Sequence, residues 1–159
     1  MLTLVIDFDT HLAGLDNETP MECTLAVVAD AATRDEAGKL ILMGIFDQIT
    51  ADKFPYQHLQ MFLAVRLSAS PAEFGRNKDF EFAFVGPDGE TLGGGKSKAQ
   101  VPKPESGTRS NVEMLVRMVN VPFPKPGAYQ ISILVGGDQK AAIRIDAVQR
   151  TPKRRKRND

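Results

Sequence analysis

The sequence predicts an all-β protein, a single antiparallel β-sandwich of about seven to nine strands. Three observations support this fold class. Apolar and polar residues alternate in short runs, which is typical of half-buried strands. Turns containing glycine and proline separate these runs at the spacing of an antiparallel sandwich. No long amphipathic helix pattern is evident, so a parallel sheet built from βαβ units is not expected. The strand arrangement stays open between an immunoglobulin-like and a C2-like sandwich.

The expected strands follow from the apolar runs. They fall at residues 22–29, 40–46, 59–67, 79–85, 111–121, 128–135 and 140–148. The run DFEFAFV at 79–85 places its three phenylalanines on one face of a strand. The run at 111–121 is ambiguous, because Glu113 and Arg117 stand four residues apart, as on one face of a helix. Its valine content and its Asn-Val-Pro ending favour a strand.

Two turns are predicted from residue type. In Gly86-Pro87-Asp88-Gly89, proline presets φ and the final glycine accepts a positive φ, as a tight turn requires. Gly136-Gly137-Asp138-Gln139 is a short glycine-led connection between the last two alternating runs, which we expect to form a β-hairpin.

The chain is expected to form one domain with two terminal segments. Its 159 residues suit a single core, placed at residues 21–148. Residues 1–20 are either an N-terminal extension or an extra edge strand, because apolar residues alternate from residue 2 to residue 8. Residues 149–159 are expected to be a disordered basic tail, which either keeps the chain soluble or contacts nucleic acid or another polyanion.

Composition indicates a cytoplasmic protein. No apolar run reaches the roughly 20 residues of a membrane-spanning helix, and the N-terminus lacks the basic region of a secretory signal. Cys23 is the only cysteine, so no internal disulfide can form.

The stretch GETLGGGKS at residues 89–97 is similar to the end of a phosphate-binding P-loop. Such a loop needs a glycine at position 90, but Glu90 stands there. It also needs a helix after Ser97, and Pro102 and Pro104 disfavour one. The stretch is therefore expected to be a mobile glycine-lysine loop between strands, with no nucleotide bound.

No catalytic or metal-binding pattern stands out. The chain has two histidines, His11 and His58, far apart in sequence, which excludes zinc-ligand spacing. Calcium at an acidic loop and a hydrolase site gathering Asp47, His58 or Cys23 remain open alternatives. We expect no enzyme activity, no cofactor and no metal. The acidic residues considered for calcium are Asp30, Asp35, Glu36, Asp47 and Asp52.

Two motifs resemble a family of small, uncharacterised bacterial all-β proteins, classed as a domain of unknown function. They are GKLILMGIFD at residues 38–47, followed by Phe54-Pro55, and NVPFPKPGAY at residues 120–129. The resemblance covers about residues 21–148 and implies an all-β sandwich without an established activity. Four residues of these motifs have expected structural roles: Gly44 in a bulge or close backbone approach, Phe123 at the end of the core, Gly127 in a turn, and Tyr129 bonding back to the connection before it.

The leading hypothesis is a non-enzymatic binding or adaptor module that contacts a protein partner through loops or an edge strand. The alternatives are a nucleic-acid-associated module and a hydrolase with an unrecognised site. The possible polyanion contacts are Lys96, Lys98, Lys103, Arg109, Arg150, Lys153, Arg154, Arg155, Lys156 and Arg157.

Overall fold

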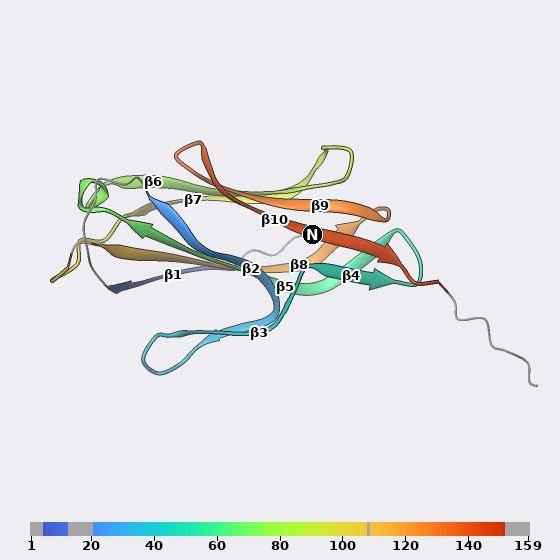
Figure 1. The fold of residues 1–159 in the computed structure, drawn as a ribbon, viewed down its shortest axis with the longest axis horizontal. Helices are drawn as coiled ribbons and strands as arrows, with labels where there is room; N and C mark the ends of the chain where they lie inside the picture. The colour runs from blue at the N-terminus through green and yellow to red at the C-terminus, as the bar shows by residue number, and fades with distance from the viewer. Residues whose placement is uncertain (1–4, 13–20, 108, 152–159) are drawn as a thin grey trace, which may run out of the picture.

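The computed structural model describes residues 5–12, 21–107 and 109–151, which form two five-stranded β-sheets (Figure 1). Sheet A contains, in spatial order, β1 (Val5–Leu12), β8 (Ser110–Phe123), β5 (Tyr56–Ala69), β2 (Glu22–Arg34) and β3 (Leu40–Phe46). Sheet B contains β4 (Gln48–Ala51), β10 (Asp138–Gln149), β9 (Gly127–Val135), β6 (Asn77–Val85) and β7 (Thr91–Gln100). A 3₁₀ turn, η1 (Pro71–Glu73), precedes β6. The predicted all-β class is confirmed.

The strand count and directions refine the prediction. Nine strands lie between residues 22 and 149, at the upper end of the expected number, and β1 adds a tenth beside β8. The ambiguous run at 111–121 lies within β8 and is a strand. The expectation of a purely antiparallel arrangement is wrong, because β4 pairs in parallel with β10. The four residues of β4 are too few to give a periodic signal in the sequence.

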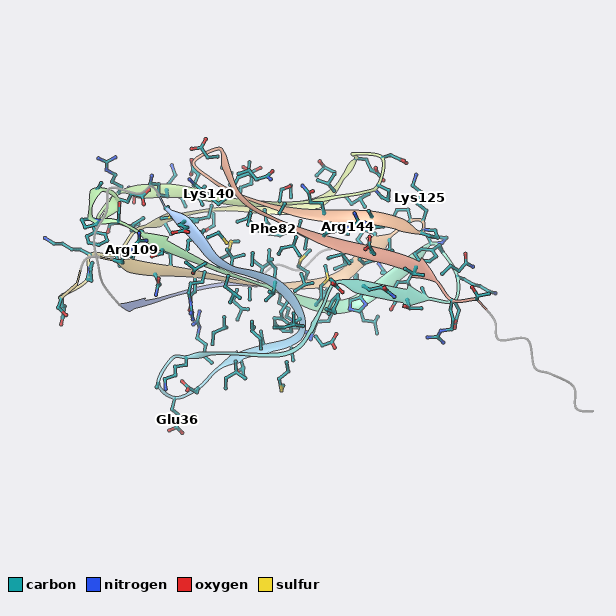
Figure 2. The ribbon with its side chains drawn as sticks, in the orientation of Figure 1. Glu36, Phe82, Arg109, Lys125, Lys140 and Arg144 are labelled. Atoms are coloured by element: carbon teal, nitrogen blue, oxygen red, sulfur yellow. The ribbon has the colours of Figure 1, made fainter. Side chains whose placement is uncertain are left out.

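One hydrophobic core lies between the two sheets. Alternate residues of β5 and β8 point into it from sheet A, and those of β6 and β9 from sheet B. Phe80, Phe82 and Phe84 are each 1% exposed, as their spacing predicts. Figure 2 shows Phe82 between the layers. Phe84 packs against Phe123 and Tyr129, with ring centroids 5.4 and 5.5 Å away.

The glycine-lysine stretch is not a loop, and this expectation is corrected. Residues 91–100 form β7, which pairs antiparallel with β6 along the edge of sheet B. The preceding Gly86–Gly89 turn is present, with the Gly89 amide donating to the Gly86 carbonyl at 3.0 Å. Glycine has low strand propensity, so the stretch resembles a loop by composition. It is a strand because β6 supplies partners along it from Thr91 to Gln100, with one register shift at Leu92.

Gly94 is required for this pairing, and we expect Gly94→Ala to lower the free energy of unfolding by about 1–3 kcal/mol. A Cβ at Gly94 would lie 2.6 Å from the Phe82 carbonyl oxygen on β6, so the strands would have to separate. Urea denaturation measures the loss. Lys96→Ala on the same strand is the matched control, and an equal loss in both variants would contradict the steric explanation.

A two-stranded arm extends from sheet A. β2 pairs with β5 only from Glu22 to Ala29, but it pairs with β3 as far as Arg34. Beyond Ala29 the β2–β3 hairpin therefore leaves the sheet, and Figure 1 shows it below the two layers. We call residues 30–45 the arm. The Asp35 side chain closes its tip by accepting hydrogen bonds from the backbone amides of Ala37 and Lys39.

Candidate protein-interaction site

The outer strand of the arm exposes a row of apolar side chains. Ile41, Met43 and Ile45 are 41%, 57% and 59% exposed and alternate along β3. β3 has a neighbour on one side only, β2, so its other edge has no strand partner among the described residues. From Leu40 to Met43 it pairs with β2 residue by residue, which leaves a regular row of backbone groups at the free edge.

The other edge strands carry features that discourage pairing with a further strand. β4 is four residues long. β7 carries Lys96 and Lys98, and charged side chains at an edge disfavour the approach of a strand. The β1 sequence contains Asp7 and Asp9. β3, with the sequence LILMGIF, contains no charged residue. Of the four edges, β3 is therefore the one best suited to take a partner strand.

An ion cluster around one buried carboxylate holds the arm against sheet A. Arg34, in the arm, contacts Glu113 of β8, with Nη1 2.5 Å from Oε2. Arg66 of β5 binds the other oxygen of the same carboxylate, with Nη2 2.6 Å from Oε1. The Glu113 side chain is only 5% exposed. Two guanidinium groups on one desolvated carboxylate hold three strands together, so the row on β3 is presented by an anchored arm.

The predicted basic contacts do not form one patch. Lys96 and Lys98 face acidic residues across the β6–β7 pair, with Nζ 3.8 Å from Glu81 and 3.7 Å from Asp79. Both pairs lie at the β7 edge of sheet B. Arg150 lies at the opposite edge, 3.3 Å from Asp52, where its amide bonds to β4.

Two further basic residues lie between β7 and β8, where Lys103 is exposed and Arg109 donates a hydrogen bond to Ser68 Oγ at 3.1 Å. The residues Lys153, Arg154, Arg155, Lys156 and Arg157 lie outside the described residues. The basic side chains that the structure does place are thus spread over several edges, and three of them are already paired with carboxylates.

Two of the residues considered for hydrolysis, Cys23 and His58, are not brought together. Cys23 pairs with Leu67 at one end of β5, whereas His58 lies near its other end, about 30 Å away along the strand. Burial raises the pKa of the Cys23 thiol, which disfavours the reactive thiolate. Among the described residues, no group of three or more histidine, cysteine, aspartate or glutamate side chains could hold a metal ion. His11 lies in β1, and its side chain is outside the described part.

The motif residues near the end of the core make local contacts. The Tyr129 hydroxyl donates to the Lys125 carbonyl at 2.6 Å and accepts from the Lys125 amide at 3.2 Å. Phe123 is fully buried, with its ring centroid 4.8 Å from that of Tyr129. A Cβ at Gly127 would lie 2.7 Å from Pro87, so glycine permits close approach of the Gly86–Gly89 turn.

Gly44 lies where the arm leaves the sheet. Its φ is 69°, and a Cβ there would lie 2.5 Å from Asp30 Oδ2 on the neighbouring strand. Glycine therefore allows both the left-handed backbone and the close approach of Asp30. This is the close approach expected from the sequence; the β2–β3 register shows no shift at this position.

Comparison with known proteins identifies the family. The sequence matches the family described as "Family of unknown function (DUF6941)" over residues 24–148. The chain belongs to DUF6941. The match spans the region from β2 to β10, which confirms the resemblance drawn from the two motifs. No curated protein matches the chain.

A solved structure with some likeness is the Pseudomonas fluorescens alkylpurine DNA glycosylase AlkC bound to DNA containing an abasic site analog. The alignment has a TM-score of 0.46 and 11% identity, and it covers 82% of this chain but 31% of that chain. The DUF6941 chain thus matches less than a third of that protein's length. A likeness at this level carries no argument about function. No helix among the described residues is long and apolar enough to cross a membrane.

Proposed function

We propose that this chain is a non-enzymatic, cytoplasmic binding module that recruits a protein partner by adding a partner strand to the free edge of β3. The observation that carries the proposal is the exposed row Ile41, Met43 and Ile45 on an edge strand without charge. In strand addition, backbone hydrogen bonds supply affinity and alternate side chains supply specificity. The free edge and the apolar row of β3 offer both components.

The partner is expected to be an extended segment with apolar residues at alternate positions. Such a segment would place its backbone against Leu40–Met43 and its side chains beside the exposed row. The ion pair between Arg34 and Glu113 supports this function, because it orders the arm before the partner arrives. Because the arm is ordered before binding, less conformational entropy is lost when the partner strand is added.

The scaffold that fits this function is an immunoglobulin-like β-sandwich. Two sheets share one core, and Tyr129 bonds back to the connection before its strand in the manner of a tyrosine corner. The parallel pairing of β4 with β10 is a local addition to that plan. In such scaffolds the edges and loops bind partners while the core stays unchanged.

Replacing Met43 with lysine is expected to weaken partner capture by at least about tenfold, since a charge would be placed in the centre of the apolar row. The measurement is quantitative capture from lysate on immobilised wild-type and M43K chains, followed by hydrogen exchange of residues 40–46 with the purified partner. Binding by strand addition should slow exchange of the β3 amides.

Leu59→Lys is the matched control, because Leu59 is 75% exposed but lies on β5, away from the β3 edge. It should capture the same partner as the wild type. Equal capture by M43K, or unchanged exchange in β3, would refute the proposal. Sedimentation of the purified chain tests one further outcome, a second copy of the chain as the bound partner.

A further inference from the structure

A hollow of about 230 Å³ lies where the arm joins the body, next to β4 and β5. Three rings contribute to its lining. The Phe46 and His58 centroids are 5.8 Å apart, and those of Tyr56 and His58 are 6.1 Å apart, with both ring pairs tilted by more than 50°. Gln48 and Thr50 of β4 add polar side chains. The rings thus form a bent aromatic wall rather than a closed stack.

One carboxylate faces this aromatic wall. Asp30 lines the same hollow, and the structure gives it no hydrogen bond or ion pair with any residue that it describes. Gly44 leaves room for this carboxylate, since a Cβ at Gly44 would lie 2.5 Å from Asp30 Oδ2. The exposed Asp30 carboxylate therefore lines the hollow without a paired cation among the residues that the structure describes.

The charge of the hollow favours a cation. Burial lowers the pKa of His58, although the Asp30 carboxylate acts in the opposite direction, so the imidazole is mostly uncharged at neutral pH. The lining then holds one negative charge and no positive one. Aromatic faces within about 6 Å attract ammonium and guanidinium groups, and a nearby carboxylate adds a charge-assisted bond.

We propose that the hollow lined by Asp30, Phe46, Tyr56 and His58 is a binding site for a cationic side chain, a lysine, an arginine or a methylated lysine of a peptide. The cation would contact the rings and pair with Asp30. The hollow shares Phe46 with the end of β3, but it is not lined by Ile41, Met43 or Ile45, so either site can exist without the other.

The cationic side chain could come from either of two sources, which experiment can distinguish. One is a basic segment of another protein. The other is the C-terminal segment of this chain, whose sequence contains five consecutive basic residues at 153–157. The Arg150 amide bonds to the Ala51 carbonyl of β4, and Gln48, Ile49 and Thr50 of β4 line the hollow. Seven residues beyond Arg150 span up to about 23 Å, so the basic residues are within reach.

The test is a titration of the full chain with the octapeptide PKRRKRND, the sequence of residues 152–159, followed by NMR. We expect saturable shifts of the Phe46, Tyr56 and His58 resonances. Asp30→Asn should weaken the affinity by about tenfold, whereas Asp138→Asn, in the distant β9–β10 hairpin, should leave it unchanged. Met43→Lys should also bind the peptide normally, which separates this site from the β3 edge.

The source is decided by a full-length variant in which residues 153–157 are replaced by glutamine. Tighter peptide binding to this variant than to the wild type would show that the chain's own segment competes for the hollow. Equal binding would assign the site to a partner's basic segment. The proposal is overturned if the ring resonances do not shift, or if Asp30→Asn and Asp138→Asn bind the peptide equally well.

Discussion

Phe123→Ala is expected to lower the free energy of unfolding by about 3–5 kcal/mol, the largest single loss that we foresee in the core. Phe123 is fully buried, and its ring contacts Phe84 of sheet B and Tyr129 edge-on. Truncation would leave a cavity between the two sheets and remove two aromatic contacts. Urea denaturation with an unchanged m-value measures the loss as a change in stability alone.

Two further variants give smaller expected losses in the free energy of unfolding, for comparison with Phe123→Ala. Tyr129→Phe keeps the ring but removes its hydrogen bonds to Lys125, so a loss of about 1–2 kcal/mol is expected. Leu59→Ala shortens an exposed side chain and should change stability by less than about 0.5 kcal/mol. A Phe123→Ala loss no larger than that of Tyr129→Phe would show that the cluster does not join the two sheets.

Glu113→Ala is expected to cost about 3–5 kcal/mol, because it leaves the guanidinium groups of Arg34 and Arg66 without their shared carboxylate. Arg34 is only 14% exposed at its side chain, so its charge cannot return to water unless the arm moves. The expected consequence beyond lower stability is release of the arm. Limited trypsin digestion under native conditions measures this as faster cleavage next to Lys39 at the arm tip.

Glu81→Ala is the matched control, since its pair with Lys96 is exposed on both sides and such pairs contribute about 0–1 kcal/mol. Global unfolding is monitored in parallel, so cleavage at the arm is compared at equal populations of unfolded protein. A Glu113→Ala loss below about 1 kcal/mol would contradict the expected cost of removing the carboxylate that Arg34 and Arg66 share. Unchanged cleavage would mean that packing alone holds the arm.

Phe123→Ala and Glu113→Ala test different parts of the molecule, the core and the proposed binding edge. Phe123 is part of the core between the sheets, whereas Glu113 fixes the arm that presents Ile41, Met43 and Ile45. If the β3 edge is the binding site, Glu113→Ala should weaken partner capture even under conditions in which the core remains folded. Phe123→Ala should weaken capture only to the extent that it unfolds the chain.

The all-β class and several turns were predictable from the sequence because both depend on local chemistry. Period-two alternation places Phe80, Phe82 and Phe84 on one buried face whatever the neighbouring strands are. The Gly136-Gly137 turn joins β9 to β10 with φ of 59° and 88°, values that glycine adopts without steric cost. Tyr129 and its connection lie within four residues of each other, so their contact is also local.

Only the tertiary structure decided the roles of β3, β7 and Glu113. The composition of β3, LILMGIF, is typical of a buried strand. Its side chains are exposed because β3 lies at the edge of sheet A. That position depends on pairing between segments that are distant in sequence. The glycines of β7 resemble a loop until β6 is placed beside them. Glu113 and Arg34 are 79 residues apart, and Asp30 and His58 line one hollow only because the arm joins the body there. Alternation and turn chemistry are properties of neighbouring residues, whereas edges, hollows and buried ion pairs arise only when the sheets assemble.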